Sequence, residues 1–104
     1  MEYTTLGRTE LKVSRVGLGG GGIGQVWGST TRDEAIMAIH RAMDLGVNFL
    51  DTAIGYGEGQ SESIIGNALK GKRDKMIIAT KFNLSKMENE TVRQRIERKV
   101  DESL

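Results

Sequence analysis

The sequence predicts an α/β fold in which parallel strands alternate with helices. Three observations favour this fold. Apolar, β-prone runs and helical patterns alternate three times along the chain, the connections between them are short, and one run, residues 76–79, is uninterrupted, as in strands covered on both faces. Parallel strands joined by helices have right-handed crossovers. A complete (βα)8 barrel takes about 250 residues, so the 104 residues of this chain fall short of one.

A short hairpin is expected at about residues 3–14, ahead of the main pattern. Residues 3–6 and 11–14 are β-prone and flank a turn-rich tetrapeptide at 7–10. Residues 13–18 are predicted to be the first core strand, which leads into a tract of glycines.

The first βα unit, at about residues 13–45, should contain a helix that begins after Thr31. Residues 31–34 fit a capping box, in which the threonine hydroxyl accepts from the N–H of Glu34 and that carboxylate accepts from the N–H of Thr31. Gly46 supplies the left-handed conformation that ends a helix. Between these limits, apolar residues recur at helical spacing: Ile36, Ile39, Ala42 and Met43.

Two further βα units are expected at about residues 47–70 and 76–104. Each joins an apolar strand, at 47–50 or 76–79, to a helix with an apolar stripe. The stripes are Ile64, Ile65, Ala68 and Leu69 in the second unit, and Val92, Ile96, Val100 and Leu104 in the third. We expect the third unit to be truncated, because no fourth strand follows it.

Composition excludes several classes of function. The net charge is +1 with both signs interspersed, which predicts neither a nucleic-acid partner nor a membrane partner. Without cysteine the chain forms no disulfide, thiolate or Cys-based zinc site, and no metal site is predicted. The first residues lack the features of a secretion signal, and no apolar run approaches the roughly 18 residues of a membrane span. A cytoplasmic location is therefore expected.

An acid, a phenol and an ammonium group follow two neighbouring strands. Asp51 and Lys81 come just past two apolar runs, and the carboxyl ends of parallel strands face one cleft. Tyr56 lies far enough beyond Asp51 for its ring to fold back over the strand ends. Singly, these residues also fit a cap, loop packing and a solvated strand end. Their joint spacing favours a site that delivers a proton.

The glycine tract at residues 17–22 matches the G-x-G-x-x-G fingerprint of Rossmann units. That interpretation is disfavoured, because the fingerprint needs its helix to begin within the glycines, whereas residues 23–30 intervene here. The tract instead predicts a close approach of the backbone to a ligand or to a neighbouring strand end. A flexible turn is the alternative.

Several segments, taken together and in order, resemble the aldo-keto reductases. The first signature of that family is closely similar to residues 46–53 followed by Tyr56-Gly57, Ser61-Glu62 and Ile65-Gly66. Residues 6–9, 13–14, 17–19 and 78–81 resemble the flanking segments. The resemblance implies a partial TIM (βα)8 barrel, in which an amino-terminal hairpin is followed by three βα units with parallel strands.

The resemblance also implies an oxidoreductase that reduces aldehyde or ketone carbonyls with NADPH, NADH being the alternative. By matched position, Asp51, Tyr56 and Lys81 would be three of four catalytic residues, with Tyr56 as the general acid. A phenol ionises near pH 10, and a nearby ammonium stabilises its charged form. Lys81 would therefore tune Tyr56, while Asp51 keeps Lys81 charged and oriented.

The loop after the first strand would line the cofactor and the substrate in this family. Asp51 and the backbone of Gly20 and Gly21 would contact the cofactor, and Trp27 and Tyr56 would line the substrate pocket, although Trp27 fits simple packing equally well.

The family's fourth catalytic residue, a histidine after the fourth strand, has no counterpart here. His40 lies within the first helix and is predicted to be a surface or packing residue. We therefore expect a fragment that is inactive alone and can self-associate through an exposed sheet edge. A non-catalytic NADPH-binding regulatory or structural module and an inert fragment are the alternatives.

Overall fold

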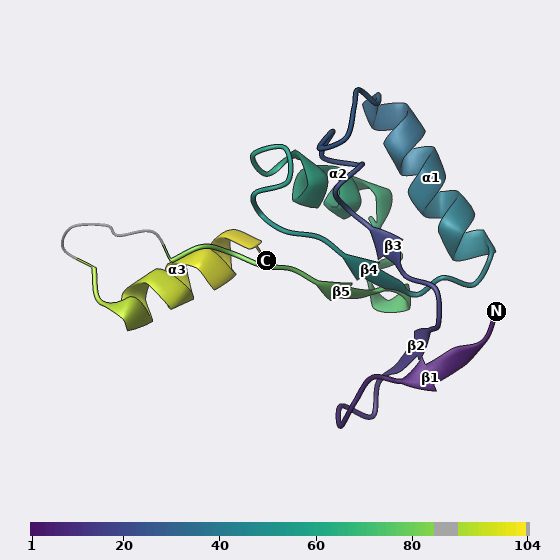
Figure 1. Ribbon diagram of the computed structural model, residues 1–104, viewed down its shortest axis with the longest axis horizontal. Coiled ribbons are helices and arrows are strands. Elements are labelled where there is room, and N and C mark those ends of the chain that lie inside the picture. The colour runs from purple at the N-terminus through teal and green to yellow at the C-terminus, as the bar shows by residue number, and fades with distance from the viewer. Residues whose placement is uncertain (85–89, 104) are drawn as a thin grey trace.

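The computed structural model describes residues 1–84 and 90–103, which form a hairpin and a three-stranded parallel sheet (Figure 1). In the hairpin, β1 (Tyr3–Thr5) pairs antiparallel with β2 (Lys12–Ser14). The parallel sheet has the order β3 (Leu18–Gly19), β4 (Phe49–Asp51) and β5 (Ile77–Ala79). This arrangement confirms the predicted hairpin followed by βα units with parallel strands.

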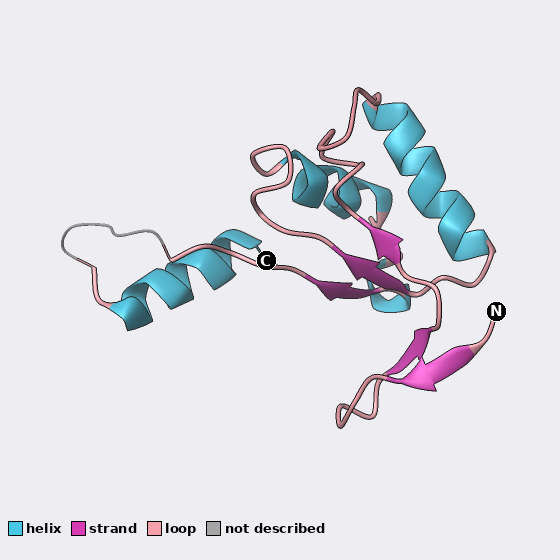
Figure 2. Cartoon of the chain, in the orientation of Figure 1, coloured by secondary structure: helices cyan, strands magenta, loops and turns pink. Residues whose placement is uncertain are grey.

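Helices follow each of the parallel strands. They are α1 (Arg32–Asp44), α2 (Gln60–Ala68) and α3 (Val92–Ser103), and a short 3-10 helix, η1 (Arg73–Lys75), leads into β5. Figure 2 shows α1 and α2 beside the parallel sheet and α3 apart from them. None of the helices in the described part of the chain has the length and apolar character of a membrane span.

The predicted capping box starts α1. Thr31 Oγ1 accepts from the N–H of Glu34 at 3.1 Å, and the N–H of Thr31 donates to Glu34 Oε2 at 3.1 Å. That backbone hydrogen bond is the main reason why the pKa of Glu34 lies below its ordinary value. At the other end, Gly46 has a φ of +93°, as the left-handed position after a helix requires.

The prediction of one core strand over residues 13–18 was wrong. The structure divides this run between β2 in the hairpin and β3 in the parallel sheet. Ser14 makes the break: its N–H donates to Asn48 Oδ1 at 2.6 Å, and its hydroxyl donates to the carbonyl of Val16 at 2.7 Å. Residues 13–18 are therefore shared between two separate sheets.

The core lies between the parallel sheet and the helices α1 and α2. Its buried residues are Ile23, Ala35, Ile39, Leu50, Ile64, Ile65, Ala68, Leu69 and Met76. Leu50 is the central residue of β4, so its neighbour Asp51 points to the opposite face. The face turned away from the helices therefore carries Asp51 at the end of β4, together with Phe49 and Ile77.

Helix α3 stands outside this core. Its predicted apolar stripe is present in Val92, Ile96 and Val100, but each of these is at least 40% exposed. Leu104, the last predicted member of the stripe, lies outside the described residues. Figure 1 shows α3 projecting away from the sheet and its two helices.

Candidate active site

Asp51 and Lys81 meet at the carboxyl ends of two adjacent strands. Asp51 is the last residue of β4 and is in register with Ala79 at the end of β5. Lys81 follows shortly after, and its Nζ donates to Asp51 Oδ1 at 2.7 Å. The parallel pairing of β4 and β5 therefore produces this ion pair directly.

Lys81 makes two further contacts. Its Nζ donates to the carbonyl of Thr52 at 2.8 Å and lies 5.6 Å from the centroid of the Tyr56 ring. An ammonium at that distance from an aromatic ring is within cation–π range. The structure thus brings the three side chains from the sequence pattern into one cluster.

The hydrogen bond with Asp51 raises the pKa of Lys81 above its ordinary value of 10.5, and the negative charge of Asp51 adds to this rise. Desolvation acts in the opposite direction but is outweighed. Lys81 therefore remains a cation throughout the neutral pH range, beside the phenol of Tyr56.

The loop that carries Tyr56 is folded tightly. The N–H of Tyr56 donates to the carbonyl of Ala53 at 3.1 Å, and Gly57 and Gly59 have φ values of +63° and +95°. A side-chain carbon at Gly57 would lie 2.5 Å from the carbonyl oxygen of Gly24. The Tyr56 loop thus lies directly against the backbone of the glycine-rich loop.

The glycine tract makes two close approaches of different kinds. A side-chain carbon at Gly20 would lie 2.6 Å from Thr52 Oγ1, and one at Gly21 would lie 2.7 Å from the ring of Trp27. Gly20 therefore approaches a neighbouring strand end, whereas Trp27 rests on Gly21 and stays 80% exposed. Both contacts disfavour the flexible-turn alternative.

The prediction that Gly20 offers backbone groups to a cofactor conflicts with this geometry. Its N–H donates to the carbonyl of Asp51 at 2.8 Å, and its carbonyl accepts from Ser61 Oγ at 2.8 Å and from the N–H of Gly24 at 3.1 Å. Because these internal bonds occupy the donor and both acceptor lone pairs, Gly20 shapes the loop.

Sequence reasoning missed two residues behind the cluster. Thr52 and Ser61 are 1% and 0% exposed as residues, and their hydroxyl oxygens lie 2.7 Å apart. In the sequence pattern, Ser61 is only part of the Ser61-Glu62 pair of the reductase-like segment. The one available signal was a pair of small hydroxyl residues within the reductase-like segment, one on each side of Tyr56.

His40 lies far from this cluster in the fold. Its Nε2 is 2.8 Å from the carbonyl of Ala68 at the end of α2, which agrees with its interpretation as a packing residue. It lines a hollow of about 320 Å³ together with Tyr3, Lys72 and Lys75. The hollow is also lined by the end of α1 and by residues 46–48, which precede β4. It therefore lies at the amino end of that strand, whereas Asp51 and Lys81 lie at the carboxyl ends.

Another hollow, of about 370 Å³, lies between α2, β5 and α3, and its lining includes Ile65, Phe82 and Val100. Asp51 and Lys81 line neither hollow, and their side chains are each 54% exposed. Among residues 1–84 and 90–103, no group of three or more acidic or histidine side chains could hold a metal ion.

The model of the aldo/keto reductase family matches residues 15–104. The chain belongs to this family. Over its whole length it is 44% identical to the aldo-keto reductase YhdN of Bacillus subtilis and covers 34% of that protein. It is also 41% identical, over 81% of its length, to an NADH-specific methylglyoxal reductase of Escherichia coli, of which it covers 27%.

Solved structures of the family share the fold. The holo form of aldo-keto reductase AKR11C1 from Bacillus halodurans matches the whole chain with a TM-score of 0.84 and 31% identity. The chain covers 35% of that protein. It therefore spans about a third of the length of its relatives, and it has the fold of the corresponding part of their barrel.

Proposed function

We propose that this chain supplies part of the active site of an oxidoreductase that reduces the carbonyl group of small aldehydes or ketones. The observation that carries the proposal is the position of Lys81, which binds Asp51 at 2.7 Å and lies 5.6 Å from the Tyr56 ring. Carbonyl reduction adds a hydride to carbon and a proton to oxygen, and this cluster suits the second task.

Tyr56 is the proton donor in this proposal. Its phenol donates a hydrogen bond to the carbonyl oxygen of the substrate and then transfers the proton as negative charge develops there. The ammonium of Lys81 stabilises the phenolate that remains. Asp51 holds that ammonium in place and keeps it charged, since its hydrogen bond raises the pKa of Lys81.

The described residues fit the nicotinamide end of a dinucleotide cofactor, which supplies the hydride when bound. The half-exposed carboxylate of Asp51 has acceptor lone pairs beyond those that Lys81 uses, and these suit ribose hydroxyl groups. The N–H of Gly21 is the backbone group that we propose for contact with the cofactor, because the carbonyl of Gly21 accepts from the N–H of Val26 at 3.0 Å. We expect NADPH as the cofactor. NADH is the alternative, because the E. coli relative is named an NADH-specific reductase.

Trp27 and Tyr56 are the residues that we propose to line the substrate pocket. The exposed indole of Trp27 offers an apolar surface held against Gly21, which suits the apolar part of a carbonyl compound. The exposed cluster also lacks a cover among the described residues, whereas hydride and proton transfer need water to be excluded. We therefore propose that the 104-residue chain is inactive alone.

Tyr56→Phe tests the proton-donor role in the complete natural protein that contains this sequence. We expect kcat for carbonyl reduction to fall by about 10²- to 10⁴-fold, the usual contribution of a general acid. The dissociation constant of NADPH should stay near its wild-type value. Titration with NADPH, followed by the quenching of tryptophan fluorescence, measures that constant. Trp27 is the one tryptophan in this sequence, so any other tryptophans of the complete protein are replaced first.

Tyr3→Phe is the matched control. It removes the same hydroxyl from the other tyrosine of the chain, which donates to the carbonyl of Gly46 at 2.8 Å at the opposite end of the fold. This variant should keep the wild-type kcat. Turnover at the wild-type rate by Tyr56→Phe would remove Tyr56 from the acid role, and NADPH binding without any turnover by the wild type would favour a regulatory module.

A further inference from the structure

Two buried hydroxyl groups connect three elements directly behind the candidate site. Ser61 Oγ donates to the carbonyl of Gly20 at 2.8 Å, and Thr52 Oγ1 lies 2.7 Å from Ser61 Oγ. A serine hydroxyl has one hydrogen, and here Gly20 receives it, so Thr52 must be the donor to Ser61. This series of two hydrogen bonds therefore connects the end of β4, the first turn of α2 and the end of β3.

The same two residues hold the cluster through their backbones. The carbonyl of Thr52 accepts from Lys81 Nζ at 2.8 Å, while the N–H of Thr52 donates to the carbonyl of Ala79 in β5 at 2.8 Å. The N–H of Ser61 donates to the carbonyl of Tyr56 at 3.2 Å. Movement of Thr52 or Ser61 would therefore displace Lys81 or Tyr56, two residues of the proposed active site.

The surrounding backbone leaves this arrangement little freedom. A side-chain carbon at Gly20 would lie 2.9 Å from Ser61 Oγ, and one at Gly24 would lie 2.6 Å from the carbonyl carbon of Tyr56. The glycine-rich loop thus contacts both the hydroxyl pair and the Tyr56 loop. Because both hydroxyl groups are buried away from water, breaking either bond leaves an unpaired polar atom in a low-dielectric interior.

We propose that Ser61 is a positioning residue, which, through Thr52 and Gly20, sets the place of Tyr56 relative to Lys81. The proposal rests on the function proposed above, because it concerns the geometry of that site. Ser61 touches neither substrate nor cofactor in this role. Its hydroxyl fixes the distance between a loop that carries the acid and the strand ends that carry Lys81 and Asp51.

Ser61→Ala in the complete protein tests the proposal. We expect kcat to fall by about ten- to a hundredfold with KM little changed, since displacement of a reacting group by about 1 Å costs up to about a hundredfold. The matched control is Ser63→Ala, which removes an exposed hydroxyl from the same helix and should leave kcat unchanged.

A second pair of variants keeps the test decisive if Ser61→Ala does not fold. Thr52→Val removes the hydroxyl at nearly constant shape and should reproduce the loss of kcat, whereas Thr52→Ser keeps the hydroxyl and should restore it. A purely structural role would lower the melting temperature of Thr52→Val without this selective loss of kcat.

A measurement without turnover separates this proposal from the proposed function. In a ¹³C NMR titration, the pKa of Lys81 should fall toward its ordinary value in Ser61→Ala and Thr52→Val but not in Ser63→Ala. If Tyr56→Phe abolishes reduction while Ser61→Ala and Thr52→Val keep the wild-type kcat and Lys81 titration, the positioning role is wrong and the proposed function stands. If Tyr56→Phe has no effect, the proposed function fails, and the Lys81 titration alone decides the positioning role.

Discussion

Lys81 is the residue at which the polar contacts of the candidate site meet. Its ammonium donates to Asp51 and to the carbonyl of Thr52, and it lies beside the ring of Tyr56. These contacts fix the direction of the ammonium. Because the side chains of Lys81 and Asp51 are each 54% exposed, solvent screens the ion pair, and we expect it to contribute orientation more than stability.

We expect Lys81 to titrate above 10.5, and Asp51→Asn to bring its pKa back toward that value, because the hydrogen bond with Asp51 is the main cause of the rise. A pKa raised by folding means that the stability contributed by Lys81 is present below the unfolded pKa near 10.5 and is lost as the pH rises through the folded pKa. ¹³C NMR of Lys81 Cε over about pH 9 to 12 measures this.

Asp74→Asn is the control for that titration, since it removes a carboxylate from η1, which precedes β5 at the opposite end of that strand. It should leave the Lys81 titration unchanged. Identical titration of Lys81 in the wild type and in Asp51→Asn would contradict the assigned cause.

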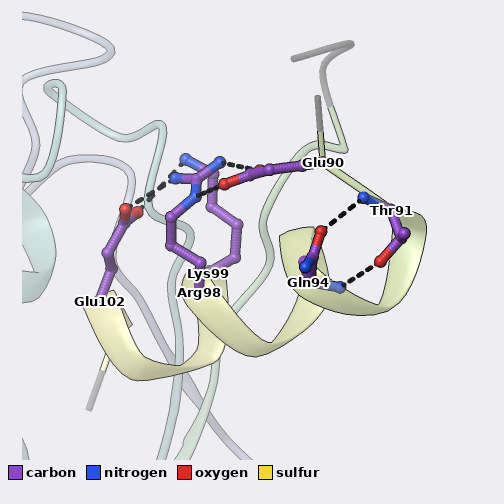
Figure 3. A network of polar contacts seen from close by, with 6 residues as sticks. All are labelled: Glu90, Thr91, Gln94, Arg98, Lys99 and Glu102. Atoms are coloured by element: carbon purple, nitrogen blue, oxygen red, sulfur yellow. Dashed lines mark hydrogen bonds and ion pairs between the residues drawn. The ribbon is translucent and has the colours of Figure 1, made fainter. Parts of the chain in front are cut away.

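At the scale of elements, α1 and α3 begin in the same way but are held by different forces. Both have a capping box, and in α3 Gln94 accepts from the N–H of Thr91 while Thr91 Oγ1 accepts from the N–H of Gln94 (Figure 3). Arg98 then binds Glu90 and Glu102. No described residue of α3 is buried, whereas α1 buries Ala35 and Ile39 in the core.

Thr31→Ala should therefore lower the free energy of unfolding by about 1 kcal/mol, the typical value for a lost cap. Thr91→Ala should change the same quantity by less than about 0.5 kcal/mol, because α3 lies outside the core. Chemical denaturation measures the first effect, and faster amide exchange confined to α3 reveals the second. Equal losses of stability in the two variants would mean that α3 folds together with the core.

Local signals predicted some elements well and others poorly. The start and end of α1 follow from the capping box at residues 31–34 and from Gly46, and both are interactions within a few residues. The break between β2 and β3 depends on Asn48, which is distant in the sequence and accepts from the N–H of Ser14. Within residues 13–18, the pair Ser14-Arg15 and Gly17 interrupt the β-prone pattern, but the side chain that binds Ser14 lies outside the segment.

At the scale of the whole molecule, the described sheet is open. Its outer strands β3 and β5 each pair with β4 alone, and α1 and α2 cover one of its faces (Figure 1). The radius of gyration is 14.9 Å, against about 13 Å for a compact domain of this length. Unpaired strand edges and uncovered apolar residues are templates for association.

We predict that the isolated 104-residue chain is marginally stable and self-associates through β5. Its melting temperature should then depend on protein concentration, and analytical ultracentrifugation should detect species larger than the monomer. Ile77→Lys should reduce this association. Ile78 packs against the core, so its neighbour Ile77 lies on the opposite face of β5, where a lysine would place a charge on the edge strand. A monomer with a sharp, concentration-independent melt would contradict the prediction.

The sequence by itself determined the order of strands and helices, the limits of α1 and the three residues that meet at the strand ends. Those features follow from local periodicity and capping, and from the rule that parallel strands align their carboxyl ends. Only the tertiary structure decided that Gly20 packs against Thr52, that Ser61 joins the loops, and that residues 13–18 are divided between two sheets. These contacts join residues far apart in the sequence, and the distances between them are set by packing.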